Sequence, residues 1–206
     1  MSARKVLVFG GSFNPPHLRH ISLAQQAAAA IGADEIRVIP ANINPQRQEQ
    51  PPASARHREA MLRLAFAGET RAVIDTQEIE RGGASFTVDT LSNLRAQFPA
   101  AQFFLLLGGD QALNFYSWKD PQGILALATP VVVPRAPLNA HELLQQIAAR
   151  QDAATANVWR PWILPLEAVA DSSTQLRSTI LAGAALDHTR IDPHVLAYIK
   201  QYSLYM

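Results

Sequence analysis

Two histidines stand three residues apart just after a pair of glycines near the start of the sequence. Residues 10–20 read Gly-Gly-Ser-Phe-Asn-Pro-Pro-His-Leu-Arg-His and follow an apolar run, which predicts a turn between a strand and a helix. Gly10 and Gly11 have no Cβ, so we expect a backbone that takes positive φ values and comes close to a nucleotide. A helix start offers N–H groups to an anion, and His17 and His20 add imidazole donors on one helix face. The pattern favours phosphate binding over its alternative, an ordinary strand–helix turn with surface histidines.

The composition limits the classes of protein that this chain can represent. It has 206 residues, of which 48% are hydrophobic and 17% charged, and this is typical of a globular α/β domain. The net charge is +1 without a long basic run, so we expect no nucleic-acid partner. The absence of cysteine excludes disulfides and thiolate zinc sites. No apolar run approaches the roughly 18 residues of a membrane span and no secretory signal is evident, so we expect a cytoplasmic protein without membrane contact.

The predicted strands and helices alternate along the chain. Strands are predicted at residues 5–9, 35–40, 72–75, 102–107 and 130–133, with a short sixth at 162–164. Helices are predicted at 18–31, 54–67, 87–98, 124–127, 139–150, 172–182 and 192–202, and loops at 46–52, 80–85 and 151–160. This order predicts an α/β fold, a Rossmann-like, doubly wound and mostly parallel sheet of five to six strands with helices on both faces. We expect the very apolar strand 102–107 at its centre.

The polar and glycine-rich segments follow the predicted strands. Residues 10–20, 42–47, 82–87 and 108–110 each come after a strand, and ligands of such sheets bind beyond the carboxyl ends of the strands. We therefore expect these four segments to form one site. No linker divides the chain, so the sequence predicts a single domain over residues 1–206, with a small helical part from about 172 to 206.

Three motifs resemble those of a known family. Residues 17–20 resemble the His-x-Gly-His signature of nucleotidylyltransferases, and residues 172–177, Ser-Ser-Thr-Gln-Leu-Arg, resemble the family's second signature, Ser-Ser-Thr-x-x-Arg. The stretch from Glu78 to Leu91 is similar to the Glu-x-x-Arg…Ser-Tyr-Thr-x-x-Thr-Leu stretch of bacterial nicotinate mononucleotide adenylyltransferases. Arg58 matches the helix that precedes this stretch, and Asp110 and Trp118 stand where that family keeps an aspartate and a ring-stacking tryptophan.

The resemblance implies adenylyl transfer from ATP to nicotinate mononucleotide, with Mg²⁺ accompanying ATP and no protein cage for the metal. It implies catalytic roles for His17, His20 and Arg177. The implied ATP-binding residues are Gly10, Gly11, Ser12, Phe13, His17, His20, Ser173, Thr174 and Arg177. It implies ribose contacts for Gly108 and Asp110. The implied nicotinate mononucleotide-binding residues are Arg47, Ser85, Phe86, Thr87 and Trp118.

Three positions depart from the family's pattern. Arg19 replaces the signature glycine, Phe86 replaces a tyrosine, and Gln46 replaces a histidine. Arg19 either adds a phosphate contact, points away or obstructs ATP. Two other functions therefore stay open: an adenylyltransferase for another acceptor such as nicotinamide mononucleotide, and a nucleotide-binding protein without turnover. The oligomeric state is open as well, a homo-oligomer included.

Overall fold

The computed structural model describes residues 3–46, 53–134, 136, 138–166, 173–184 and 189–206. Its centre is a five-stranded, all-parallel sheet with the strand order β3-β2-β1-β4-β5. The strands are β1 (Lys5–Gly11), β2 (Glu35–Pro40), β3 (Ala72–Ile74), β4 (Gln102–Gly108) and β5 (Ala128–Val133). The α/β, Rossmann-like fold predicted from the sequence is thereby confirmed.

The order of the strands corrects one expectation. β1 lies at the centre of the sheet, and the more apolar β4 lies between β1 and β5. An apolar sequence indicates that helices cover both faces of a strand. Helices cover both faces of every interior strand in such a sheet. Apolar content therefore identifies β4 as an interior strand without placing it in the middle.

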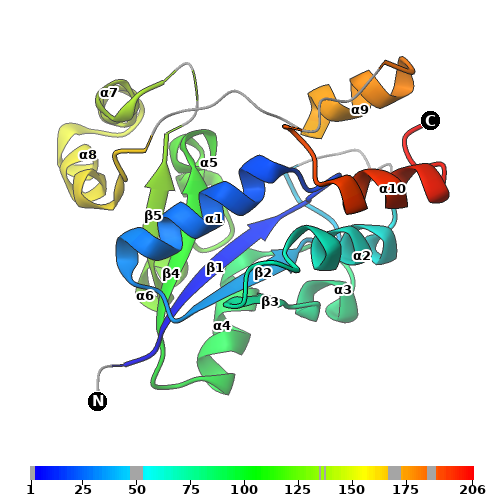
Figure 1. Cartoon of the computed structure of the whole chain (residues 1–206). Coiled ribbons are helices and arrows are strands. Elements are labelled where there is room, and N and C mark those ends of the chain that lie inside the picture. The colour runs from blue at the N-terminus through cyan, green and yellow to red at the C-terminus, as the bar shows by residue number, and fades with distance from the viewer. Residues whose placement is uncertain (1–2, 47–52, 135, 137, 167–172, 185–188) are drawn as a thin grey trace.

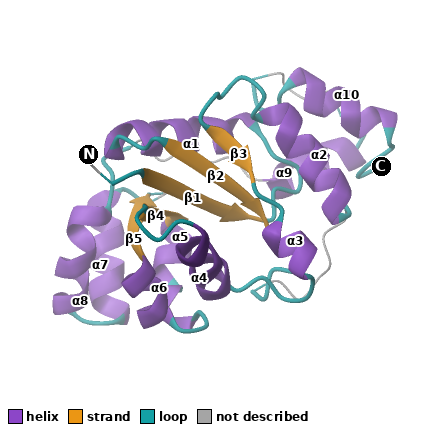
Figure 2. Cartoon of the chain, turned by 90° about the horizontal axis from the view of Figure 1, so that it is seen from below, coloured by secondary structure: helices purple, strands orange, loops and turns teal. Residues whose placement is uncertain are grey.

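Helices pack on both faces of the sheet (Figures 1 and 2). One face carries α1 (Leu18–Ile31), α2 (Ala55–Ala65) and α10 (Pro193–Gln201). The other face carries α4 (Thr87–Gln97), α6 (Pro121–Leu127), α7 (Ala140–Arg150) and α8 (Ala153–Trp159). The remaining helices are α3 (Gln77–Arg81), α5 (Gly109–Leu113), α9 (Ser173–Leu181) and the 3₁₀ turns η1 (Phe115–Ser117) and η2 (Arg160–Trp162).

The side chains of β1 alternate between two apolar clusters. Leu7 and Phe9 pack on the α1 side, whereas Val6 and Val8 pack on the α4 side. This alternation is the period of two that an extended strand imposes on its side chains. Because both faces of β1 are buried, its carboxyl end is fixed relative to the helices that surround the cavity described below.

The turn from β1 into α1 differs from the expected geometry. Gly10 and Gly11 pair with β2 inside the strand, and neither has a positive φ. The positive φ of 47° falls on Phe13 instead. A Cβ on Gly11 would approach the Phe13 ring to 3.0 Å, whereas a Cβ on Gly10 would meet nothing within 4 Å. Gly10 thus leaves its backbone open to the cavity, while the reversal of the chain occurs two residues after the glycine pair.

Three other local predictions are wrong. Residues 151–160, predicted as a surface loop, contain α8, where the Asp152 side chain accepts a hydrogen bond of 2.7 Å from the Thr155 N–H. Trp159 at the end of this helix is fully buried, and its ring lies 5.2 Å from that of Phe115. The predicted sixth strand at 162–164 is η2 followed by a single bridge between Ile163 and Val132. Residues 77–81, partly assigned to a loop, form α3.

Candidate functional site

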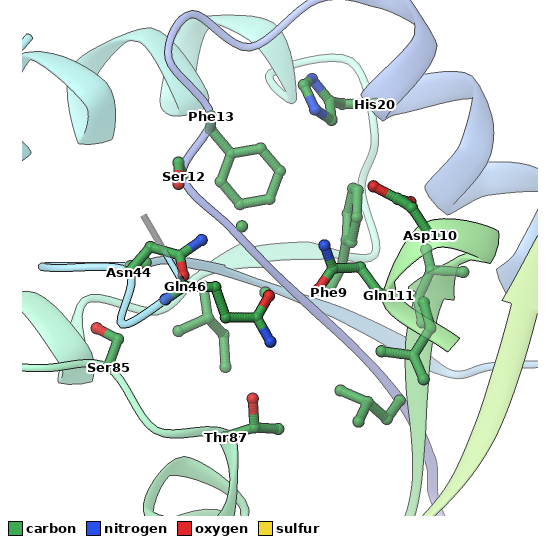
Figure 3. Close-up of a pocket in the computed structure, with 18 of the residues that line it drawn as sticks. Phe9, Ser12, Phe13, His20, Asn44, Gln46, Ser85, Thr87, Asp110 and Gln111 are labelled. Carbon is green, nitrogen blue, oxygen red and sulfur yellow. Dashed lines mark hydrogen bonds between the residues drawn. The ribbon is translucent and has the colours of Figure 1, made fainter. Parts of the chain in front are cut away.

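A cavity of about 600 Å³ opens at the carboxyl ends of the parallel strands, as expected for this class of sheet. Most of the site residues predicted from the sequence line it: Gly10, Gly11, Ser12, Phe13, His17, His20, Ser85, Phe86, Thr87, Gly108, Asp110, Trp118, Ser173 and Thr174. Figure 3 shows His20 at the top of this space, Thr87 at the bottom and Asp110 at the right. Arg177 is not among the lining residues, and the predictions for Arg47 and Ser172 lie outside the described residues.

The two signature histidines lie together at the start of α1. His17 is the N-cap residue and is buried, with 4% of its surface exposed. The backbone N–H of His17 donates to His20 Nδ1 at 3.1 Å, and the two rings stack with their centroids 3.7 Å apart. The Phe13 ring meets that of His20 edge-on, at 5.1 Å. The imidazoles therefore sit where the first N–H groups of a 14-residue helix point, which is a favourable place for phosphate oxygens.

The loop between β1 and α1 is held by donors that come from distant parts of the chain. Ser173 Oγ donates to the carbonyl of Pro15 at 2.9 Å, and Arg177 Nη1 donates to the carbonyl of Asn14 at 2.7 Å. The Tyr205 hydroxyl donates to the Asn14 side-chain oxygen at 2.6 Å. Burial raises the pKa of Tyr205, so this hydroxyl keeps its proton. These contacts attach α9 and the segment after α10 to the loop that precedes His17.

Arg177 contacts this loop and is not among the residues that line the cavity. Its guanidinium donates to the Asn14 carbonyl and, at 3.2 Å, to Thr174 Oγ1. Thr174 itself lines the cavity and is exposed. The arginine therefore connects the first loop to the start of α9, and its predicted pairing with phosphate stays a prediction.

Arg58 does not line the cavity but holds the loops beside it, a role that the sequence does not indicate. It is 1% exposed, and its guanidinium donates to the carbonyls of Ala53 at 3.3 Å, Ser12 at 3.0 Å and Asn42 at 3.2 Å. Burial lowers the pKa of Arg58. One planar group thus joins the loop after β1 to the loop after β2 and to the start of α2. The only signal in the sequence was the position of this arginine within the family resemblance.

The start of α4 forms the opposite end of the cavity. Phe86 is the N-cap residue, and the first N–H groups of the helix follow at Thr87 and the next residue. The backbone N–H of Asn42 donates to Ser85 Oγ at 2.9 Å, and the Ser85 N–H donates to the carbonyl of Ile43 at 2.8 Å. The loops after β2 and α3 are therefore joined directly in front of the helix start.

Glu78 is a buried acid in the wall beside this helix start. It is 6% exposed, lines the cavity and accepts a hydrogen bond of 2.6 Å from Thr90 Oγ1. Burial is the main cause that raises the pKa of Glu78, against the hydrogen bonds from Thr90 and Ser85, which lower it. The Glu78 side chain therefore connects α3 to the residues that present the start of α4.

The loop that follows α5 adds an aromatic and a cationic side chain at the same end. Trp118 is half-buried against Phe115, with ring centroids 5.6 Å apart, and its ring also lines the cavity. Lys119 Nζ contacts both carboxylate oxygens of Asp89 at 3.0 Å and lies 4.6 Å from the centre of the Phe86 ring. Stacking and charge are thus available together beside the start of α4.

Arg19 and Gln46, which depart from the family pattern, and Gly108 and Asp110, which are predicted to contact a ribose, also line the cavity. Arg19 lines it from the first turn of α1, and Gln46 lines it from the loop after β2. Gly108 is the N-cap residue of α5, and a Cβ there would come within 2.8 Å of Asp110 Oδ1. Glycine at 108 therefore gives the Asp110 carboxylate its room beside the end of β4.

Within the described ranges, no group of three or more histidine, aspartate or glutamate side chains is arranged to hold a metal ion. None of the helices in the described part of the chain is long and apolar enough to span a membrane.

The comparison with family models assigns the class of this chain. Residues 8–179 match the family described as cytidylyltransferase-like. The chain therefore belongs to the cytidylyltransferase-like family, and the match runs from the second half of β1 through most of α9, across the elements that surround the cavity.

Curated relatives are similar over the full length. A protein of Chromobacterium violaceum is 39% identical over 215 residues, and one of Bordetella pertussis is 40% identical over 210 residues, each covering 100% of both chains. Both carry the name "Probable nicotinate-nucleotide adenylyltransferase".

Solved structures share the fold. The nicotinic acid mononucleotide adenylyltransferase of Plasmodium falciparum, complexed with NaAD, has a TM-score of 0.75 at 17% identity over 98% of this chain and 97% of its own. Its complex with APC gives the same TM-score at 16% identity, with the same coverage. These solved structures support the fold described above. The curated relatives add that full-length similar proteins carry the name nicotinate-nucleotide adenylyltransferase.

Proposed function

We propose that this protein transfers the adenylyl group of ATP to nicotinate mononucleotide, which yields deamido-NAD and pyrophosphate for NAD synthesis. The observation that carries the proposal is the single cavity that joins both predicted signatures, His17 and His20 on α1 and Ser173 and Thr174 on α9, to the start of α4. The full-length relatives carry the name of this activity, which supports the same acceptor.

The residues around the cavity divide into two groups in this proposal. ATP phosphates bind at His17, His20, Ser12, Ser173 and Thr174, with the backbone of Gly10 and Gly11 close to the nucleotide. Asp110, an acceptor of hydrogen bonds when ionised, takes ribose hydroxyls beside Gly108. Trp118 stacks on the pyridine ring at the start of α4, where Ser85, Phe86 and Thr87 surround its carboxylate.

The chemistry requires alignment and charge stabilisation. A phosphate oxygen of the acceptor attacks the α-phosphorus of ATP, the bond to the bridging oxygen breaks, and pyrophosphate leaves with the electron pair. The acceptor phosphate is already a nucleophile at neutral pH, so no side-chain base is needed. His20 donates to the oxygens on which negative charge grows, and the start of α1 adds its N–H groups.

Magnesium enters this proposal together with ATP. The described residues offer Asp110 and Glu78 as separate carboxylates in the cavity wall, which fits an ion that keeps phosphate and water ligands. When bound to the triphosphate, Mg²⁺ neutralises part of its charge. The role of the chain is then to hold the polyanion with the donors at the starts of α1 and α9.

A pyrophosphate-release assay with identification of the dinucleotide tests the proposal. The protein is given ATP, Mg²⁺ and either nicotinate mononucleotide or nicotinamide mononucleotide, and the products are separated by chromatography. We expect deamido-NAD and equimolar pyrophosphate from the nicotinate substrate. Preference for the nicotinamide substrate would select the alternative acceptor, and ATP binding without pyrophosphate from either would select a non-catalytic nucleotide-binding protein.

The proposal extends to the domain organisation and the cellular location of the protein. We propose one nucleotidylyltransferase domain over residues 1–206, in which the helical part after about residue 172 belongs to the active site. The contacts of Ser173, Arg177 and Tyr205 with the loop before His17 support this organisation. The proposed location is the cytoplasm, where both substrates would be small molecules.

A further inference from the structure

The fixed positive charges of the cavity are separated into two places. Among the described residues that line it, two are lysine or arginine: Arg19, in the first turn of α1, and Lys119, in the loop after α5. Arg19 stands beside the histidines that would hold ATP phosphates. Lys119 lies at the other end, beside Phe86 and Trp118. This end is away from the start of α1, where the acceptor phosphate would react.

The acceptor of the proposed reaction has two anionic ends of its own. Its phosphate must lie near α1, because the new phosphorus–oxygen bond forms there. Its carboxylate sits on the pyridine ring at the far end of the molecule, and this ring comes to the part of the cavity formed by Phe86 and Trp118. Lys119 is the fixed cation that the described chain places at that end.

We infer that Lys119 is a further specificity-determining residue, whose ammonium pairs with the carboxylate of nicotinate mononucleotide and selects it over the neutral amide. The inference rests on the proposed function. The Lys119 ammonium lies 4.6 Å from the centre of the Phe86 ring, directly beside the first turn of α4. A carboxylate that reaches the first N–H groups of α4 therefore meets the ammonium as well.

Asp89 is the group that the substrate carboxylate would replace on the Lys119 ammonium. It belongs to the first turn of α4, and both of its carboxylate oxygens contact Lys119 Nζ at 3.0 Å. The side chains are 39% exposed for Asp89 and 49% for Lys119, so the pair is weak and can exchange partners. A substrate carboxylate replaces Asp89 with a group of the same charge, whereas a carboxamide offers the ammonium no charge in return. Asp89 therefore weakens the selection, because it competes with the substrate carboxylate for the same ammonium.

Three substitutions test the inference through the ratio of kcat/KM for nicotinate mononucleotide to that for nicotinamide mononucleotide. K119M should raise the KM for the nicotinate substrate about tenfold, since a charge-assisted hydrogen bond is lost, and change the KM for the amide less than about twofold. K119R keeps the charge and should retain most of the ratio. D89N frees the ammonium from its competitor and should lower the KM for the nicotinate substrate about twofold.

The control variant is K200M, which removes an exposed lysine from the last turn of α10, away from the cavity lining. It should leave the ratio unchanged. Thermal unfolding of each variant verifies the fold, and K119R with D89N carries the test if K119M does not fold. An active enzyme whose K119M variant keeps the wild-type ratio, or whose D89N variant moves in the same direction as K119M, overturns the inference alone. A wild-type protein that makes no dinucleotide from nicotinate mononucleotide overturns the proposed function and this inference with it.

Discussion

The cavity lies between two helix starts that are held in different ways. The loop before α1 is attached by the buried Arg58, by Ser173 and Arg177 of α9, and by the Tyr205 hydroxyl. The start of α4 is approached by Lys119, an exposed side chain whose partner Asp89 is also exposed. Both helix starts offer N–H groups to an anion. The first receives hydrogen bonds from side chains of α2, α9 and the segment after α10, whereas the second also has an exposed cation, Lys119, beside it.

The difference corresponds to the two tasks of the proposed reaction. Alignment of two phosphates for an in-line attack requires groups held within a fraction of an ångström, which buried hydrogen bonds supply. Recognition of one substituent on a ring requires a difference in binding free energy between two similar molecules, which a solvent-accessible charge can supply. We therefore expect substitutions near α1 to change turnover or folding, and substitutions near α4 to change substrate preference.

The largest expected effect is on turnover at the α1 side. H20A should lower kcat by about two to four powers of ten, because a preorganised donor to the developing negative charge is lost. Steady-state pyrophosphate release with saturating substrates measures the change. H141A, which removes an exposed histidine of α7, should retain normal turnover. A near-normal kcat for H20A would remove this residue from the mechanism.

The next effect is on folding through Arg58. R58M should lower the free energy of unfolding by about 2–4 kcal/mol, because three backbone carbonyls lose their common donor inside the protein. Urea titration followed by circular dichroism gives the value. R63M, which removes an exposed arginine of the same helix paired with Glu59, should change it by less than about 0.5 kcal/mol. Equal values for the two variants would contradict the role assigned to Arg58.

A smaller effect is expected at Arg177. R177K should lower kcat/KM for ATP about tenfold, because a single ammonium does not reproduce the fork that joins the Asn14 carbonyl to Thr174. The matched control is R150K in the exposed last turn of α7. If kcat/KM for ATP is unchanged in R177K, the geometry of the guanidinium has no part in ordering the first loop.

The smallest effect is a pH dependence at the α4 side. The folded protein raises the pKa of Glu78 above its ordinary value of 4.5, mainly by burial. Folding therefore favours the protonated form, and the associated stability is lost as the pH rises from 4.5 through the raised pKa. The glutamine of E78Q does not titrate, so the variant does not lose this stability. The free energy of unfolding of E78Q should therefore rise relative to that of the wild type as the pH rises over this range. Urea titrations at several pH values compare the two, and parallel curves would contradict the assignment.

Local sequence signals predicted much of the fold, and contacts between distant residues account for what they missed. The bounds of α1 and the end of that helix at Gly32 follow from helix propensity and a left-handed glycine cap, both of which are local. By contrast, α8 has only seven residues, and its stability depends on burying Trp159 against another helix layer. No pattern within residues 151–160 predicts the contact of Trp159 with that layer.

The same distinction applies to the candidate site. Motif residues such as His17 and Thr174 were predicted as site residues because their types and spacing match a signature, and they do line the cavity. The contact between Arg58 and Ser12 spans 46 residues, and that between Tyr205 and Asn14 spans 191. Positioning of this kind depends on the packed fold, so only the structure identifies the residues that provide it.

The most direct test is a crystal structure of the protein with a non-hydrolysable ATP analogue and nicotinate mononucleotide bound together. We expect the triphosphate at the start of α1 within hydrogen-bond distance of His20, and the nicotinate carboxylate at the start of α4 beside Lys119. We also expect the acceptor phosphate in line with the α-phosphorus. A nicotinate ring bound away from α4, or a triphosphate out of reach of His20, would contradict these expectations.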